Sequence, residues 1–399
     1  RVVANGLIAY ALCQHWGNRP DRFATAGTPE ANLLSALAFT GASPDTPATR
    51  SRLGIPTAAP PAPPSVLRDL TDANAIRWDF SVGAAEGWPV RVIALDERTA
   101  REFFRVDHPA ARISTAALGL MLPPPTVGST ESATMVIAPS PILGTHVIEH
   151  VLQPAMSLFP GGSVYADFES WPGVTANHQE LLRLLAEYTP LVFLSGDVHY
   201  STTAALAYTR GTTNAKGAQV TSSGAKNADT KTMVLHLLGD FATKLGIERE
   251  RSMTGFLTLS AAQRAQLASP PVPGSVLPYD DLNDVMLGLV FRNGQSSPVV
   301  MATEVATAYG FGAGDWHYTV SPVDDETMPL AGSLLTDMTA APGVWSGWDS
   351  AKSWMVVKAL RACDLHRIGR VFIGLPQISL LEFTTGPLTM HHHLTAAVG

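Results

Sequence analysis

An acid and an imidazole directly follow an apolar run in the stretch LVFLSGDVHYST, residues 191–202. The apolar residues 191–194 predict a buried strand, and Asp197 and His199 come just after it. Residues two apart in extended backbone point to the same side, so the two side chains can share one metal ion. Oxygen and nitrogen ligands of this kind suit zinc, iron or manganese. The alternative is a structural pair, in which Asp197 caps a following helix and His199 hydrogen-bonds to it.

The elements around this stretch follow the order strand, exit loop, helix, strand, which is typical of an α/β fold. A strand around residues 90–95 ends at Asp96, a second covers about 135–138, and an amphipathic helix covers 176–188. In open α/β sheets, polar residues at the carboxyl end of a buried strand point into the crevice where ligands bind. We therefore expect neighbouring positions in one sheet for the strands near Val92, Met135, Val192 and Val220.

The rest of the chain carries weaker periodic signals. Helical spacing starts near residue 7 and is ended by Gly17-Asn18, and a second helix covers about Pro29–Phe39. The proline-rich residues 56–64 predict a surface connection. In the second half we expect helices over 230–246 and 350–363, strands over 217–221 and 315–325, and a hairpin that turns around Gly374–Gln377.

Composition excludes several classes of protein. The formal net charge is −7 and there are no basic runs, which argues against a nucleic-acid-binding surface. No window approaches 18 uninterrupted apolar residues, so we expect no membrane span. Two cysteines among 399 residues provide no disulfide framework. Localisation and oligomeric state stay open.

The stretch VFLSGDVHYS resembles the late metal-binding motif of the PhoD-like alkaline phosphatases, a branch of the calcineurin-like metallophosphoesterases. Three further stretches, VIALDERTAREF, ESWPGVTANHQELLRLL and QVTSSGAKN, resemble segments of the same family and occur in the family's order. Trp171 and Gly173 match the family in the second of these. The resemblance covers residues 90–227. It implies an α/β/β/α sandwich of two mixed sheets flanked by helices, with residues 1–227 in the metallophosphoesterase domain and 228–399 as an extension that completes it.

The resemblance implies metal-dependent hydrolysis of phosphate mono- or diesters at a centre of two metal ions. Asp197 and His199 would be ligands of one ion, and the metals would be iron, calcium, zinc or manganese. Arg98 would contact the substrate phosphate, because its planar fork matches phosphate oxygens, and Trp171 would form one wall of the pocket. The alternatives are a salt bridge from Arg98 to a neighbouring glutamate and a purely core position for Trp171.

The sequence also departs from the family. Glu97 stands where the family has Thr, Glu169 and Pro172 where it has Asp, and His178 where it usually has Arg. The family's early Gly-Asp and Asp-Asp-His-Glu ligand segments do not occur at the expected places. We therefore expect the chain to start just after them, to carry part of the metal site, and to be nearly inactive alone. The alternatives are a catalytically silent protein that serves binding or surface structure, and a hydrolase of non-phosphate esters.

Other polar clusters have simpler interpretations. His391–His393 predict an exposed terminal strand, since adjacent residues alternate faces and at most two imidazoles converge. Asp280-Asp281 and Asp324–Glu326 predict solvated loops. His146 and His150 have a spacing that binds metal on a helix, but no third ligand accompanies them.

Overall fold

The structure is a computed structural model that describes residues 2–39, 45–56, 65–103, 110–122, 124–125, 131–145, 171–172, 175–188, 190–196, 198, 201–222, 250–267, 298–323, 377–384 and 389–396. The expected helices over 230–246 and 350–363 lie outside these ranges, as do the acidic stretches near 280 and 325.

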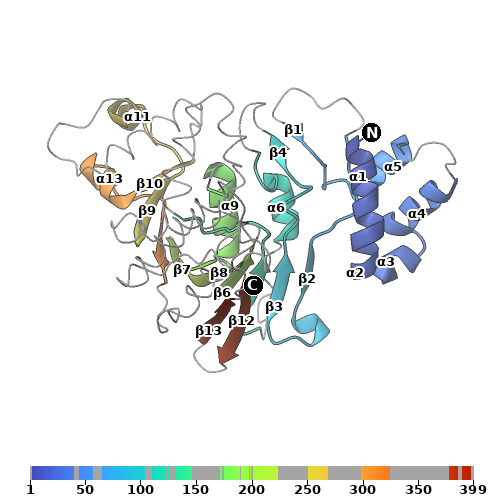
Figure 1. Ribbon diagram of the computed structural model, residues 1–399. Coiled ribbons are helices and arrows are strands. Elements are labelled where there is room, and N and C mark those ends of the chain that lie inside the picture. Colours follow the sequence, from blue (N-terminus) through green and yellow to red (C-terminus); the bar gives the residue numbers. More distant parts are fainter. Residues whose placement is uncertain are drawn as a thin grey trace, which may run out of the picture.

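The chain opens with a helical unit that lies beyond one edge of the main sheet (Figure 1). It contains α1 (Val2–Tyr10), the π-helical turn η1 (Ala11–His15), α2 (Trp16–Asn18), α3 (Pro20–Ala24), α4 (Pro29–Phe39) and α5 (Pro47–Arg52). The predicted helix to Asn18 and the helix over Pro29–Phe39 are confirmed. Buried side chains of α1, α4 and the segments after them form a separate small core: Leu7, Leu33, Leu53, Ile76 and Trp78.

A nine-stranded mixed sheet forms the body of the protein, in the order β10-β9-β11-β7-β8-β6-β5-β3-β2. Its strands are β2 (Phe80–Val82), β3 (Arg91–Ala94), β5 (Thr134–Ile137), β6 (Leu191–Ser195), β7 (Thr202–Arg210), β8 (Thr213–Thr221), β9 (Arg251–Phe256), β10 (Val299–Ala302) and β11 (Trp316–Pro322).

The four strands that the sequence placed side by side are neighbours. β3 pairs with β5, β5 with β6, and β6 with β8, all in parallel, in a register that aligns Val92 with Met135 and Met135 with Val192. The segments of β3, β5 and β6 are predominantly apolar, as is usual for parallel strands, which is why they were visible in the sequence. Their central side chains Ile93, Val136 and Phe193 are almost completely buried.

The remaining strands of the sheet are antiparallel to their neighbours. β7 and β8 form a hairpin through Gly211, whose φ of 57° suits the left-handed region that glycine adopts without strain. β11 pairs with both β7 and β9, and β10 lies at the edge beside β9. Strands from the second half of the chain therefore extend the same sheet that begins with β2.

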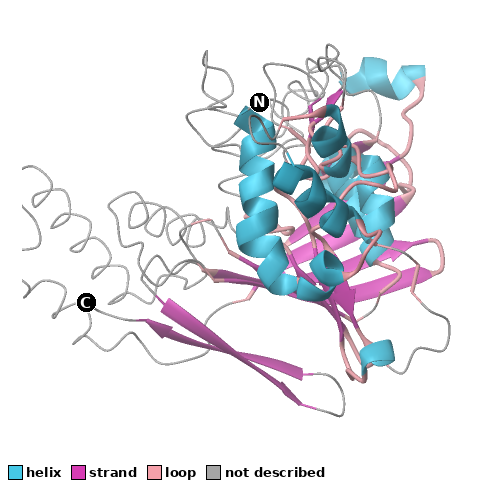
Figure 2. Ribbon diagram, turned by 90° about the vertical axis from the view of Figure 1, so that its right-hand side faces the viewer, coloured by secondary structure: helices cyan, strands magenta, loops and turns pink. Residues whose placement is uncertain are grey.

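Helices α6 (Thr115–Met121) and α9 (Thr175–Leu185) pack on the main sheet, whereas the N-terminal helical unit stands in front of it when the molecule is viewed from that side (Figure 2). The two helices α6 and α9 contact each other and bury Leu118, Leu181, Leu182 and Leu185 in the main core. α9 carries the crossover from β5 to its parallel partner β6, because parallel neighbours cannot be joined by a tight turn. The short helices η2 (Ala84–Glu86), α11 (Ala261–Leu267) and α13 (Thr303–Ala308) complete the described set.

The prediction of a mixed α/β fold is confirmed in this coarse form. Beside the large sheet, the described residues form two small two-stranded sheets: β1 (Ser65–Val66) with β4 (Glu102–Phe103), and β12 (Gln377–Thr384) with β13 (Thr389–Ala396). A second large sheet, as in an α/β/β/α sandwich, is not among the described elements.

The terminal hairpin bears on one prediction. The second strand expected after Gln377 is present in β12, which pairs with β13 so that Gln377 faces Ala396 and Thr384 faces Thr389. The expected first strand and the turn residues 374–376 lie outside the described residues. The expected exposed terminal strand at His391–His393 is confirmed, since it lies in β13 with the outer two imidazoles exposed.

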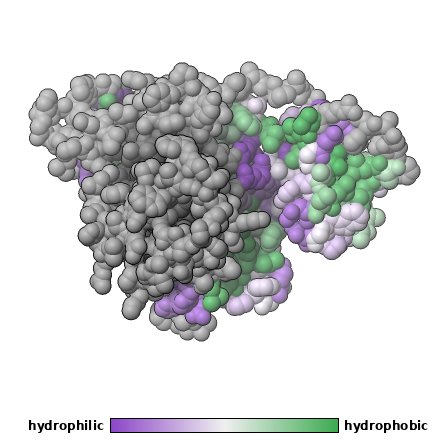
Figure 3. Space-filling view, in the orientation of Figure 1, coloured by the Kyte–Doolittle hydropathy of each residue, from purple (hydrophilic) through white to green (hydrophobic). Residues whose placement is uncertain are grey.

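The surface view shows apolar side chains over the N-terminal helical unit (Figure 3). Val2 and Val3 of α1 are among the exposed large apolar residues. In the described part of the chain, none of the helices combines the length and the apolar character that crossing a membrane requires.

Candidate functional site

The candidate site lies where the four parallel strands end, at what we call the carboxyl edge: the residues that directly follow β3, β5, β6 and β8. Backbone hydrogen bonds continue across these exits. Gly196 N donates to Pro139 O at 3.1 Å, and Ser222 N donates to Ser195 O at 2.9 Å. The exits are therefore true neighbours, and the motif that begins at Gly196 emerges beside the loop that follows β5.

Glu97, in the turn after β3, is the central charged group of this edge. Its side chain is 1% exposed. Oε1 accepts a hydrogen bond from Trp171 Nε1 at 3.0 Å, and Oε2 accepts one from the backbone N–H of Ser140 at 3.0 Å. One carboxyl group thereby joins the turn after β3, the loop after β5 and the segment that precedes α9.

Burial also changes the chemistry of Glu97. Desolvation raises its pKa to about 7, against the opposing effects of the Trp171 hydrogen bond, the Arg112 guanidinium and the Ser140 hydrogen bond. A carboxyl group with a pKa near neutral can hold or release a proton near pH 7, unlike an exposed glutamate. Such a shift at a strand exit is typical of functional sites, although buried structural networks also produce it.

The acid before it, Asp96, belongs to a structural network. Asp96 Oδ1 accepts a hydrogen bond from Thr99 N at 2.9 Å, and Oδ2 accepts one from the Thr99 hydroxyl. Arg68, whose side chain is fully buried, donates to Thr99 Oγ1 at 2.7 Å and lies 3.5 Å from Asp96 Oδ2. Arg68 also bonds the carbonyls of Leu53 and Ile76, so it fastens the N-terminal helical unit to the end of β3.

The first turn of α9 brings more buried polar groups toward the sheet. Gln179 Oε1 accepts a hydrogen bond from Trp316 Nε1 of β11 at 2.8 Å. His178 is 4% exposed, and burial, with the Arg251 cation as a further cause, lowers its pKa to about 4. His178 is therefore neutral at physiological pH. Its Nε2 and the side-chain amide of Asn177 have no hydrogen-bond partner in the described structure, which marks them as groups able to bind water or a ligand.

The structure describes two of the four predicted site residues, Arg98 and Trp171. Asp197 and His199 lie outside the described residues, although Gly196 and Val198 beside Asp197 are described. Trp171 is 1% exposed, belongs to the main core and bonds Glu97. Arg98, in the same turn as Glu97, has an exposed side chain. The expected meeting of the turn after β3 with the segment around Trp171 is thus present.

Several groups at this edge escaped the sequence interpretation. The burial of Glu97 and its bond to Trp171 join residues 74 positions apart, a pairing that spacing cannot reveal. The only available signal was the presence of a glutamate where the resembled family has Thr. Gln219 of β8 is likewise buried, and its amide exchanges two hydrogen bonds of 2.7 Å with the backbone of Leu143 in the loop after β5.

The described carboxylates at this edge already hold protein donors. Both oxygens of Glu97 and both oxygens of Asp96 accept hydrogen bonds from protein groups. Among the described residues, no three His, Cys, Asp or Glu side chains are gathered around a position that could hold a metal ion. A complete metal site at this edge would therefore need Asp197, His199 or other residues outside the described ranges.

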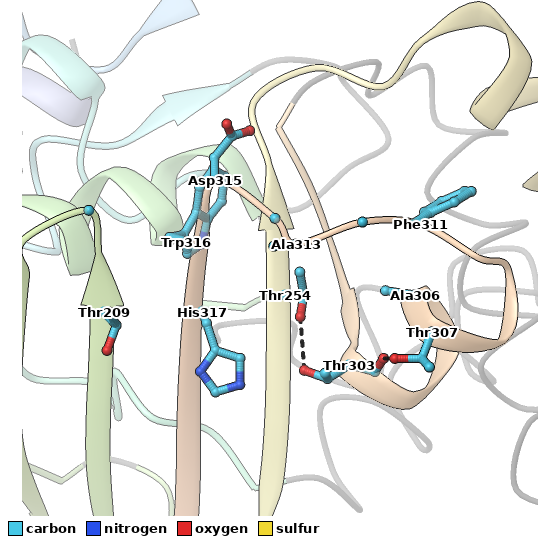
Figure 4. Close-up of a pocket in the computed structure, with 13 residues that line it drawn as sticks. Thr209, Thr254, Thr303, Ala306, Thr307, Phe311, Ala313, Asp315, Trp316 and His317 are labelled. Atoms are coloured by element: carbon cyan, nitrogen blue, oxygen red, sulfur yellow. Dashed lines mark hydrogen bonds between the residues drawn. The ribbon is translucent and has the colours of Figure 1, made fainter.

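A separate cavity of about 370 Å³ lies elsewhere on the sheet, between β7, β9, β11 and α13 (Figure 4). The imidazole of His317 lies between Thr209 of β7 and Thr303 of α13. The hydroxyls of Thr254 and Thr303 are 2.9 Å apart and bond each other. Because β7 is antiparallel to β8 and Thr209 faces Asn214 near the start of β8, this cavity lies away from the carboxyl edge. Its lining offers hydrogen bonds but no cluster of acids.

Comparisons with known proteins add no assignment. A scan against protein-family models, a search of curated proteins and a search of solved structures found no match for this chain.

Proposed function

We propose that the carboxyl edge is the active site of a phosphate-ester hydrolase and that the whole protein has the α/β/β/α sandwich of the PhoD-like phosphatases. The observation that supports this most directly is the arrangement of the parallel exits. The Ser-Gly-Asp-Val-His segment leaves β6 at Gly196, which is hydrogen-bonded to the loop after β5. That loop is in turn held by Glu97 after β3. Ligands bind at this edge in open α/β sheets.

In the proposed centre, Asp197 and His199 would hold one of two metal ions. Bound metal ions of this kind lower the pKa of a water molecule and balance charge on the phosphoryl oxygens. The described residues serve the site in other ways. Arg98 extends to solvent from the turn after β3, where its guanidinium can pair with two phosphate oxygens. Trp171 acts as a positioning residue, because its indole N–H fixes Glu97.

The test is hydrolysis of p-nitrophenyl phosphate and bis(p-nitrophenyl) phosphate by the natural protein, with iron, calcium, zinc or manganese supplied in turn. We expect metal-dependent turnover that falls by orders of magnitude in His199→Ala and Asp197→Asn. His317→Ala is the matched control, because His317 is an exposed histidine on β11 that lies outside the carboxyl edge. We also expect Arg98→Ala to raise KM more than it lowers kcat.

Two results would overturn the proposal. One is the absence of hydrolysis of both esters with every metal, which would favour a silent protein that serves binding or surface structure. The other is a turnover in His199→Ala that is as high as the turnover in the control His317→Ala. Hydrolysis of carboxylate esters but not of phosphate esters would show that the carboxyl edge is the site of a hydrolase of non-phosphate esters.

A further inference from the structure

The terminal hairpin has two faces with different partners. In the register of β12 and β13, Glu382 pairs with His391 and Leu380 pairs with His393. Side chains alternate along a strand, and directly paired residues share a face. Leu380, Glu382, His391 and His393 therefore lie on one face of the hairpin, and all four are exposed.

The opposite face is fastened to the main sheet by His392. Its Nδ1 is 3.0 Å from the hydroxyl of Thr203 on β7, and its Nε2 is 2.9 Å from the hydroxyl of Ser379 on β12. A neutral imidazole donates one of these hydrogen bonds and accepts the other. Because His392 is turned toward the sheet, its two neighbours His391 and His393 are turned outward. The hairpin thus presents an imidazole pair to solvent on a backbone that its own ladder holds in place.

The third group on this face completes a set of metal-ligand types. His393 Nε2 lies 3.3 Å from Glu382 Oε2, and the side chains are 54% and 61% exposed. Two ligand atoms on one tetrahedral zinc ion, at bonds of about 2.0–2.1 Å, are also roughly 3.3 Å apart. This nitrogen and this oxygen already have the separation that a shared zinc ion requires.

The remaining ligand, His391, must move to complete the set. The ring centroids of His391 and His393 are 6.4 Å apart, whereas two imidazoles on one zinc ion have centroids roughly 5 Å apart by the same bond lengths. The described side chains do not by themselves enclose a metal position. His391 is exposed, however, and rotation about its side-chain bonds can bring the ring toward the other two ligands. Such a site forms when the metal arrives and does not exist beforehand.

We propose that His391, His393 and Glu382 form a binding site for Zn²⁺ on the outer face of the terminal hairpin, with water in the fourth position. Two imidazole nitrogens and one carboxylate oxygen are ligands that zinc accepts in proteins. The site is independent of the proposed phosphatase centre, since it uses other residues and another sheet. A salt bridge between His393 and Glu382 without metal is the competing account, and it predicts no zinc binding. Exposed pairs of that kind contribute little to stability, so zinc binding is the property that separates the two accounts.

The test is calorimetric titration of the 399-residue chain with Zn²⁺ in an Asp197→Asn/His199→Ala background, which removes the ligands proposed at the carboxyl edge. We expect one Zn²⁺ per chain and at least tenfold weaker binding in His391→Ala and in His393→Ala. Glu382→Gln should also weaken binding, because a neutral amide is a poorer zinc ligand than a carboxylate. Cobalt substitution should give the visible absorption of a four-coordinate site, and that absorption should be lost in the same variants.

His317→Ala is the matched control, because it removes an exposed strand histidine from another part of the protein. The proposal is overturned if the background protein does not bind Zn²⁺, if binding persists unchanged in both hairpin histidine variants, or if the control loses as much affinity as they do. These variants change exposed side chains, and unchanged circular dichroism verifies that they remain folded. None of these outcomes depends on phosphatase activity, so failure of the site and failure of the proposed function are distinguishable.

Discussion

Replacing Glu97 by Gln should change how the stability of the protein depends on pH. The pKa of Glu97 rises from its ordinary 4.5 to about 7 in the folded protein, mainly by burial. The folded state therefore binds more protons than the unfolded state between these pH values. Stability contributed by this group is fully present below pH 4.5 and is lost as pH rises through about 7. With 1.36 kcal/mol for each pH unit, the loss amounts to about 3 kcal/mol.

The glutamine variant has a constant cost instead. Its amide oxygen can accept one hydrogen bond, but its NH₂ group cannot accept the second, so either Trp171 Nε1–H or Ser140 N–H loses its acceptor. An unsatisfied buried donor costs about 1–3 kcal/mol. At pH 5, where Glu97 is protonated in the folded state, Glu97→Gln should be less stable than the wild type by that amount. At pH 8 the difference should vanish or reverse, because only the wild type then buries a charge.

The measurement is the free energy of unfolding in urea between pH 5 and pH 8 for both proteins. The difference between them isolates Glu97, because every other group titrates in both. A near-ultraviolet circular dichroism change with a midpoint near pH 7, present in the wild type and absent from the variant, would report the Trp171 environment directly. A difference in stability that stays constant across this pH range would refute the assignment of a raised pKa to Glu97.

Three further predictions concern the fold around the site. Gly255→Ala should destabilise the protein by about 1–3 kcal/mol in thermal melting, because an added Cβ would overlap the buried ring of Trp316. Gly312→Ala is the control, because a Cβ there meets nothing within 4 Å. Equal effects of the two substitutions would contradict the packing of Trp316 against Gly255. Arg68→Met should lower the free energy of unfolding in urea by about 3–5 kcal/mol, because it leaves the buried Asp96 without its cation. Arg68→Lys should not restore stability, since one ammonium group cannot reach all the acceptors that the guanidinium contacts. Full rescue by Lys would contradict this. Burial lowers the pKa of His178 to about 4. The wild type should therefore lose about 3 kcal/mol of stability relative to His178→Gln as pH falls from 6.5 toward 4. Parallel profiles of unfolding free energy against pH for the two proteins would exclude a buried neutral imidazole.

Three of the four parallel strands, β3, β5 and β6, could be predicted from the sequence because they are predominantly apolar. The same criterion missed β7, Thr202–Arg210, in which buried and more exposed residues alternate and small residues dilute the apolar signal. It also missed β9, Arg251–Phe256, whose Gly255 weakens the strand pattern but makes room for a tryptophan of the next strand. Strands of this kind are stabilised by cross-strand contacts that a local pattern does not contain.

The candidate site was predictable in position but not in its internal contacts. Spacing along the chain indicated that the exits after β3, β5 and β6 meet, because parallel strands bring their carboxyl ends to one edge. Spacing could not indicate that the side chain of Glu97 is buried at this edge. Arg68 illustrates the same limit: it reads as an ordinary surface cation, yet its side chain is fully buried among acceptors from three segments.

The buried carboxyl group of Glu97 couples the geometry of the carboxyl edge to its protonation state. When Glu97 is neutral it can keep both N–H contacts at a small solvation cost, and when it is charged these contacts strengthen while burial of the charge becomes costly. The loop after β5 and the segment of Trp171 are therefore held differently below and above a pH near 7. If phosphate esters are hydrolysed at this edge, turnover should show a transition near that pH. Glu97→Gln should remove the transition while leaving a folded protein. A pH profile of turnover that is the same in wild type and variant would mean that the protonation of Glu97 is not transmitted to the exits.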